Sequence, residues 1–201
     1  MSRIGILGGS FHPIHNGHLL LGEYCLSSDM VDEIWYMPTG ISYFKKGEPM
    51  LSGEERLHMV ELAIASDPRM KALDLEVKRG GNSYTYETLE KLKILYPEHD
   101  FYFIVGADCL FTIETWKEAQ RIFDAAVLLA AGRNRISKCD LEAKANELKN
   151  RFHARIQFIE FPESPLSSTM IREKIANGED VSEDVPPAVL EEIQRKHYFL
   201  K

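Results

Sequence analysis

The chain has 201 residues, of which 44% are hydrophobic and 27% are charged, and its formal net charge is −7. This balance is typical of a globular domain and excludes a disordered chain. The negative charge argues against sequence-independent binding of nucleic acid, which needs a basic face, although a local site can still attract a small anion.

Strands and helices alternate along the whole sequence. Short apolar runs predict strands at 3–7, 33–38, 71–77, 100–106, 125–131 and 154–161. Amphipathic or capped segments predict helices at 17–28, 52–66, 84–96, 114–123, 140–152, 167–178 and 186–200. This alternation predicts an α/β fold with a doubly wound, mainly parallel sheet and helices on both faces. We expect a single domain, 1–201, on which the C-terminal helical segment from about 167 to 201 packs.

The three cysteines, Cys25, Cys109 and Cys139, form no C-x-x-C pair. We interpret them as free, buried thiols of a reducing compartment. Every apolar stretch is too short for a signal peptide core or a membrane span. We therefore expect a cytoplasmic protein without a membrane partner, and a homo-oligomer remains compatible with the sequence.

The stretch "GGSFHPIHNGH", residues 8–18, has the composition of an anion site. Gly8 and Gly9 follow the first strand and let the backbone approach a ligand closely. His15 and His18 lie three residues apart at a helix start and therefore share a face. Free amides and two imidazoles can together bind an anion. The alternatives are zinc ligation, which no second cluster of ligands supports, and ordinary helix-start residues.

Two other segments offer groups for a phosphate. In 167–178, Ser168 and Thr169 can hold phosphate oxygens at a helix start, and Arg172 projects from the same side as Ser168. The alternative is a capped helix with a surface arginine. In the loop 39–51, Lys45 can close over a triphosphate or remain an ordinary solvated lysine.

The H-x-G-H pattern after a glycine-rich turn resembles the nucleotidyltransferase superfamily. "GILGGSFHPIHNGH" as a whole is similar to the bacterial nicotinate-mononucleotide adenylyltransferases, and "GGNSYTYETL", "FIVGAD" and "SSTMIR" follow in that family's order. The resemblance runs to about residue 176, includes the last helix and implies a Rossmann-like fold. Two departures are His12, where the family usually has aspartate or sometimes asparagine, and Phe44, where it often has histidine. Lys45 occupies the matching lysine position.

The resemblance implies an enzyme that joins ATP and nicotinate mononucleotide into deamido-NAD with release of pyrophosphate. Mg²⁺ would accompany ATP, and we expect no metal site made by the protein. The catalytic groups implied are His15, His18, Lys45 and Arg172. The ATP-binding residues implied are Gly8, Gly9, Ser10, Phe11, Gly17, Gly106, Asp108, Gly132, Arg133, Ser168 and Thr169. The residues implied at the nicotinate are Tyr84, Thr85 and Trp116.

Alternative interpretations remain for several of these residues and for the function. Asp108 can bind ribose hydroxyls or cap the next helix, and Trp116 can stack on a pyridine ring or pack in the core. A sister nucleotidyltransferase acting on nicotinamide mononucleotide or phosphopantetheine would share the chemistry. A non-catalytic nucleotide-binding protein is the alternative from another class. A redox Rossmann enzyme is disfavoured because the G-x-G-x-x-G spacing is missing.

Overall fold

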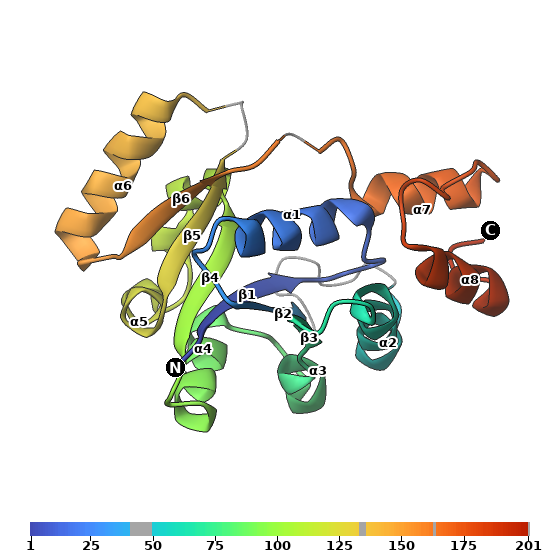
Figure 1. Cartoon of the computed structure of the whole chain (residues 1–201), viewed down its shortest axis with the longest axis horizontal. Coiled ribbons are helices and arrows are strands. Elements are labelled where there is room, and N and C mark those ends of the chain that lie inside the picture. The colour runs from blue at the N-terminus through green and yellow to red at the C-terminus, as the bar shows by residue number, and fades with distance from the viewer. Residues whose placement is uncertain (41–49, 133–135, 163, 201) are drawn as a thin grey trace.

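The computed structural model describes residues 1–40, 50–132, 136–162 and 164–200. Within these residues, six strands form one sheet in the order β3-β2-β1-β4-β5-β6, and every neighbouring pair is parallel (Figure 1). The strands are β1 Arg3–Gly9, β2 Glu33–Pro38, β3 Met70–Ala72, β4 Asp100–Gly106, β5 Val127–Gly132 and β6 Ile156–Glu160. The strand order reverses between β1 and β4, which creates the crevice where such sheets bind ligands. The predicted doubly wound, parallel sheet is confirmed.

The helices lie on both faces of this sheet. They are α1 Asn16–Ser27, α2 Gly53–Ile64, α3 Leu75–Arg79, α4 Thr85–Leu95, α5 Ala119–Ala125, α6 Lys138–Phe152, α7 Ser168–Ala176 and α8 Pro187–Lys196. Two short 3-10 helices, Ala107–Phe111 and Ile113–Thr115, follow β4.

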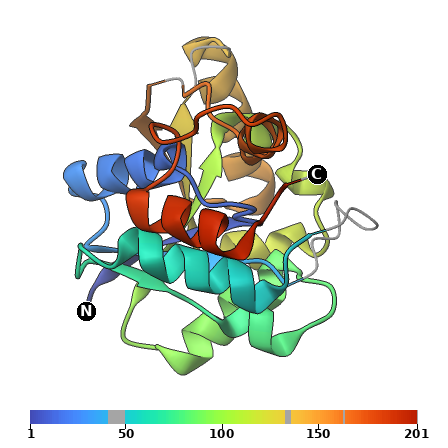
Figure 2. The same cartoon turned by 90° about the vertical axis from the view of Figure 1, so that its right-hand side faces the viewer.

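Two hydrophobic clusters separate the helices into two layers. Ile4 and Ile6 of β1 pack with α4, α5 and α6 on one face, and Leu7 packs with α1, α2, α7 and α8 on the other. This alternation follows from the two-residue period of a strand. Gly5 points to the second face, where a side chain would lie 2.7 Å from Ile34. Figure 2 shows α8 lying alongside α2, so the C-terminal segment covers the face that carries α1.

Local signals set several helix ends as predicted. The Ser52 hydroxyl accepts from the Glu55 N–H at 3.2 Å, and the Glu55 carboxylate accepts from the Ser52 N–H at 2.8 Å. This reciprocal pair is the capping box that the sequence predicts for α2. Gly178, with φ of 74°, follows the end of α7, because glycine takes the left-handed conformation without a steric penalty.

Two segments differ from the prediction. The expected strand 71–77 ends as β3 at Ala72, and the chain then turns into α3, where Glu76 is buried and accepts from the Thr88 hydroxyl at 2.7 Å. A long-range polar contact therefore overrides the alternating pattern of that segment. The expected helix 114–123 begins only at Ala119, because Glu118 has a left-handed backbone with φ of 55°.

The cysteines are free, as predicted, but they are not all buried. Cys25 is buried, Cys109 is half-buried and Cys139 is exposed on α6. Burial raises the pKa of the Cys25 thiol to about 12, so this thiol is unreactive. The expectation that all three thiols are buried is therefore wrong for Cys139. This residue lies near the start of α6, on the solvent side of that helix.

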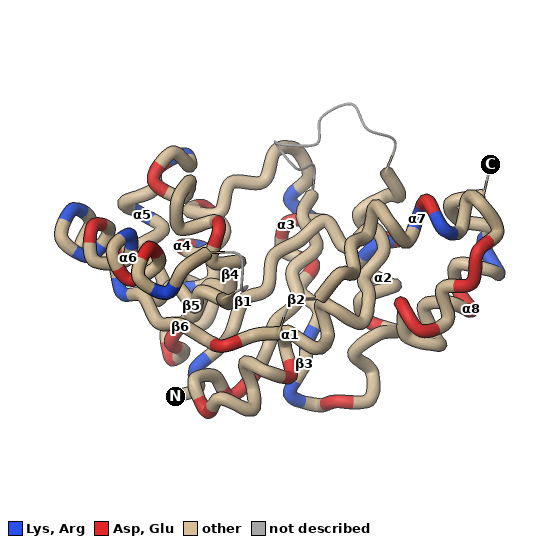
Figure 3. The backbone as a smooth tube through the Cα atoms, turned by 90° about the horizontal axis from the view of Figure 1, so that it is seen from above, with Lys and Arg blue, Asp and Glu red and all other residues tan. Residues whose placement is uncertain are grey.

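Charged residues lie mainly on the outer elements. Figure 3 shows lysine, arginine, aspartate and glutamate on α6, α7 and α8, whereas the strands of the sheet are mostly uncharged. The net negative charge of the chain is thus carried largely by its periphery. The crevice between β1 and β4 is lined by the turns that follow the strands.

Candidate active site

Residues 8–18, here called the histidine turn, place two imidazoles at the start of α1. His15 is the N-cap residue of this helix and His18 is its third residue. Their rings stack with centroids 3.7 Å apart, and the backbone N–H of His15 donates to Nδ1 of His18 at 3.3 Å. The prediction that both histidines share one face of the helix start is confirmed.

His15 is held as a neutral imidazole. Its side chain is 6% exposed, and this burial lowers its pKa to about 4, against the opposing attraction of Asp184. Its Nδ1 is buried and has no hydrogen-bond partner within the described part of the chain. A neutral imidazole carries one N–H donor, so at neutral pH His15 offers a phosphate a hydrogen bond and no positive charge.

The first half of the histidine turn is fixed by Phe11. Phe11 has a left-handed backbone with φ of 45°, and its ring is 1% exposed and meets the His18 ring edge-on at 5.0 Å. A side chain at Gly9 would lie 3.2 Å from this ring, which explains the glycine. Phe11 therefore belongs to the core, whereas Gly8 is exposed and Gly9 and Ser10 are half-buried.

The start of α7 is bound to the histidine turn. Ser167 caps the helix by accepting from the Met170 N–H at 3.2 Å. The Ser168 hydroxyl donates to the Pro13 carbonyl at 2.8 Å, and the Arg172 guanidinium donates to the His12 carbonyl at 2.8 Å. These bonds join residues 155 and 160 positions apart. The structure thus brings together two of the three segments in which the sequence predicts phosphate-binding groups.

The remaining groups of this region adjoin the same turn. A second guanidinium nitrogen of Arg172 donates to the Thr169 hydroxyl at 3.4 Å. Gly17 lets the chain before α7 approach the helix start, because a side chain there would lie 2.9 Å from the Ser164 hydroxyl. Ser168, Thr169, Arg172 and Gly17 are therefore neighbours of the two histidines.

Arg56 is a structural residue of this site that the sequence analysis does not assign to it. It is 2% exposed, and its guanidinium donates to the carbonyls of Ser10 at 2.7 Å, Thr39 at 2.7 Å and Gly40 at 2.9 Å. Its Nε donates to Leu51 at 3.2 Å. One buried side chain therefore ties the turn after β1 to the turn after β2. In the sequence, the only indication of this role is the position of Arg56 four residues after the cap Ser52.

His12 does not point toward a phosphate. Its imidazole is 5% exposed and packs edge-on against the Phe199 ring, with centroids 5.0 Å apart. The sequence analysis names His12 as a departure from the family pattern, and this packing places its ring in the interior. Tyr198 donates to the Glu55 carboxylate at 2.8 Å, so the C-terminal residues are tied to α2 as well as to His12.

Asp108 follows β4 and folds back over Gly106. A side chain at Gly106 would lie 2.5 Å from the Asp108 carboxylate, so a larger residue there would displace that carboxylate. Gly106 is the N-cap residue of the 3-10 helix 107–111, and Asp108 lies inside that helix. The alternative interpretation of Asp108 as the cap is therefore wrong, and its carboxylate lies at the carboxyl end of β4.

The expected adenine-side residues are described in part. Gly132 ends β5 and lines a cavity of about 790 Å³ together with Phe161 and Pro162. Arg133, Lys45 and Phe44 lie outside the residues that the structure describes.

The three residues expected at the nicotinate meet in one cavity. This α4 cavity, of about 680 Å³, is lined by Ser83, Tyr84, Thr85, Thr112, Thr115, Trp116, Lys117 and Ile122. Tyr84 and Thr85 form the start of α4, and no side chain caps that start within the described residues. Trp116 is half-buried and meets the Phe103 ring edge-on at 6.3 Å, so it both packs on the core and faces the cavity.

The described residues offer neither a metal-binding cluster nor a membrane-spanning helix. They hold no group of three or more histidine, cysteine, aspartate or glutamate side chains arranged to bind a metal ion. None of the helices in the same residues is both long and apolar enough to cross a membrane.

Known proteins resemble this chain along nearly its whole length. The family model described as "Cytidylyltransferase-like" matches residues 6–174. A protein of Lachnoclostridium phytofermentans named "Probable nicotinate-nucleotide adenylyltransferase" is 35% identical over 200 residues, which cover 100% of both chains. A protein of the same name from Clostridium tetani is 37% identical and covers 92% of this chain and 93% of its own.

A solved structure shows the same fold. The nicotinic acid mononucleotide adenylyltransferase of Plasmodium falciparum, described as complexed with NaAD, superposes with a TM-score of 0.79. It is 20% identical and covers 99% of this chain and 98% of its own. The parallel sheet, the paired histidines beside α7 and these likenesses lead to one conclusion: the chain belongs to the cytidylyltransferase-like family, among the nicotinate-nucleotide adenylyltransferases.

Proposed function

We propose that this protein transfers the adenylyl group of ATP to nicotinate mononucleotide, giving deamido-NAD and pyrophosphate for the biosynthesis of NAD in the cytoplasm. The relatives that share 35% and 37% of its sequence carry the name of this activity. The observation that carries the proposal is that Ser168 and Arg172 bond the backbone of the histidine turn, which carries the stacked His15 and His18 after β1. These donors come from two distant segments and converge where a doubly wound sheet binds its ligand.

The triphosphate of ATP lies on the histidine turn in this proposal. The backbone of Gly8, Gly9, Ser10 and Phe11 borders it, because glycine lets the chain approach a ligand closely, and Gly17 lets the segment before α7 lie against the helix start. His15 and His18 donate hydrogen bonds to the phosphate oxygens as negative charge develops. Ser168, Thr169 and the amides at the start of α7 add further donors, and the α7 dipole favours an anion.

Positive charge comes from other side chains, because His15 is neutral. Arg172 is fixed beside the turn by its bond to His12 and supplies a planar cation. Lys45 supplies a second cation from the loop before α2, and Mg²⁺ arrives with ATP as part of that substrate. Charge sharing among these groups lowers the repulsion between the two phosphate-bearing reactants.

The nucleoside of ATP and that of nicotinate mononucleotide lie on opposite sides of the point between β1 and β4 where the strand order reverses. Gly106 and Asp108 receive the ribose of ATP, with the Asp108 carboxylate accepting from hydroxyl groups, and Gly132 and Arg133 enclose the adenine. Tyr84, Thr85 and Trp116 receive the nicotinate ring in the α4 cavity. The uncapped start of α4 suits the ring carboxylate.

The reaction needs no nucleophile from the protein. An oxygen of the 5′-phosphate of nicotinate mononucleotide attacks the α-phosphorus of ATP in line. The bond from that phosphorus to the β-phosphate bridging oxygen breaks, and pyrophosphate leaves with its electron pair. The attacking phosphate is already ionised at neutral pH, so the protein contributes alignment and charge stabilisation.

Pyrophosphate release by the purified protein tests the proposal. ATP and Mg²⁺ are supplied with nicotinate mononucleotide, nicotinamide mononucleotide or phosphopantetheine in separate reactions. We expect the highest kcat/KM with nicotinate mononucleotide and a product with the mass of deamido-NAD. Faster turnover of another acceptor would retain the adenylyl transfer and reject the assigned acceptor. No turnover of any acceptor by folded protein would leave a nucleotide-binding function.

A further inference from the structure

The α4 cavity contains a cationic side chain that the sequence analysis did not single out. Lys117 lines this cavity, and the other lining residues are uncharged serine, threonine, tyrosine, tryptophan and isoleucine side chains. Lys117 follows Trp116 directly and precedes the left-handed Glu118, so its place at the cavity rim is set by the break before α5. The cavity therefore combines aromatic walls, hydroxyl groups and one ammonium group.

Two arginines near the start of α4 pair with carboxylates, whereas Lys117 pairs with none among the described residues. Arg121 pairs with Glu90 at 2.5 Å, and Arg79 lies 3.5 Å from the carboxylate of Glu87. The Lys117 ammonium has no carboxylate within 4.0 Å among the described residues and lies 3.9 Å from the centroid of the Tyr84 ring. Because no carboxylate of the described residues engages its ammonium, Lys117 can turn from the tyrosine ring to an anionic ligand.

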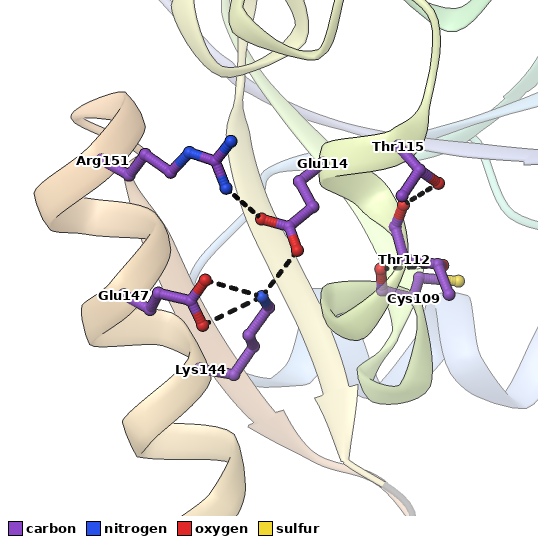
Figure 4. A network of polar contacts seen from close by, with 7 residues as sticks. All are labelled: Cys109, Thr112, Glu114, Thr115, Lys144, Glu147 and Arg151. Carbon is purple, nitrogen blue, oxygen red and sulfur yellow. Dashed lines mark hydrogen bonds and ion pairs between the residues drawn. The ribbon is translucent and has the colours of Figure 1, made fainter.

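The nearest acidic side chain on the 3-10 segment beside the cavity is directed away from it. Glu114 accepts from Lys144 at 3.0 Å and from Arg151 at 3.1 Å, and Lys144 also bonds Glu147 on α6 (Figure 4). This network draws the Glu114 carboxylate to α6, which is the side opposite the lining residues Thr115 and Trp116. The Lys117 charge at the cavity is therefore not cancelled by the acidic residue of that segment.

We infer that Lys117 selects the acid form of the pyridine mononucleotide by pairing with the carboxylate on the pyridine ring. The inference rests on the proposed function for the identity of the ligand and adds a residue that determines its specificity. A carboxylate and a carboxamide have nearly the same shape, so the α4 cavity must separate them by charge. The ammonium of Lys117 attracts the carboxylate by its charge, whereas the neutral amide offers it only a weaker hydrogen bond through the carbonyl oxygen.

The expected gain in preference for the acid over the amide is moderate, because Lys117 is exposed to solvent. Hydrogen bonds to charged groups contribute more than neutral ones, but water screens an exposed pair. We expect Lys117 to favour the acid over the amide by about tenfold. The start of α4 and the hydroxyls of the cavity supply the remaining preference, so the substitution reduces selectivity without abolishing it.

The test compares Lys117→Gln with the wild-type protein. The kcat/KM values for nicotinate and nicotinamide mononucleotide are measured with saturating ATP, and the Kd of each mononucleotide alone is measured by titration calorimetry. We expect the acid-to-amide ratio to fall about tenfold, mainly through the acid substrate, and Lys117→Arg to restore most of it. Lys93→Gln removes the same charge from an exposed position outside the cavity and should leave the ratio unchanged.

The outcomes separate this inference from the proposed function. An unchanged acid-to-amide ratio in an active Lys117→Gln variant would overturn the role of Lys117 and leave adenylyl transfer intact. An equal fall in Lys93→Gln would do the same, because it would assign the effect to overall charge. If wild-type protein turns over neither mononucleotide, the proposed function fails, and the Kd ratios still decide whether Lys117 recognises the carboxylate.

Discussion

The histidine turn and the α4 cavity hold their polar groups in different ways. The turn is fixed by donors from distant segments: the buried Arg56 and the half-buried Ser168 and Arg172 reach it across 46, 155 and 160 residues. The cavity is lined by side chains from two neighbouring segments and carries an exposed lysine. Under the proposed function, the turn is preorganised for a step common to all substrates, whereas the cavity determines which acceptor is preferred.

Removal of an imidazole from the turn should have the largest effect. We expect His18→Ala to lower kcat by about 10²–10³-fold, which is the usual loss for one preorganised donor to a developing negative charge. The control is His58→Ala, since His58 is an exposed histidine of α2. Pyrophosphate release measures both variants, and thermal unfolding verifies that they fold. A nearly normal rate in His18→Ala would place the chemistry elsewhere.

The second prediction concerns the rigidity of the turn. Arg56→Met leaves the carbonyls of Ser10, Thr39 and Gly40 without their buried donor. We expect the free energy of unfolding to fall by about 3 kcal/mol, as measured by denaturant titration. Arg69→Met, which removes an exposed arginine, should change it little. Equal losses in both variants would show that Arg56 does not clamp the two turns.

The third prediction is a pH dependence caused by His15. Its pKa is about 4 in the folded protein and about 6.5 in an unfolded chain, so the fold favours the neutral imidazole. The resulting stabilisation is fully present above pH 6.5 and is lost as the pH falls toward 4. Between pH 7 and pH 4, wild-type protein should lose about 3 kcal/mol more than His15→Asn. Parallel stability curves for the two proteins would contradict this assignment.

The smallest effect should come from the contact between the turn and the C-terminal residues. His12 and Phe199 meet edge-on at 5.0 Å. In a double-mutant cycle with His12→Asn and Phe199→Leu, we expect a coupling free energy of unfolding of about 1 kcal/mol, typical of an aromatic pair. Additive losses would mean that the two rings stabilise the fold independently. The cycle separates this pairing from the burial of each ring.

The sequence predicted the features that depend on local spacing. His15 and His18 share a face because they are three residues apart at a helix start, and the Ser52 cap with Glu55 has the same local origin. The positions of Arg56 and Lys117 were not predicted, because their partners are distant. Arg56 is recognised only when β1 and β2 bring Ser10 and Gly40 together.

Distant contacts also account for the other differences. The difference between Lys117 and its neighbour Arg121 is visible only in the fold, where Glu90 pairs with Arg121 across 31 residues. The segment 73–77 alternates like a strand, but the buried bond from Thr88 to Glu76 favours α3. The inward packing of His12 depends on Phe199, near the other end of the chain. A single sequence carries no signal for such pairings before the fold is known.

The bonds from α7 to the histidine turn have a consequence for synthesis of the protein. Arg172 is added to the growing chain 160 residues after His12, which at about 5–20 residues per second is a delay of about 10–30 s. During that interval the turn exists on the ribosome without the arginine and serine that complete it. Under the proposed function, a nascent chain therefore has no finished site for ATP, and the capacity for adenylyl transfer appears only when translation has passed α7.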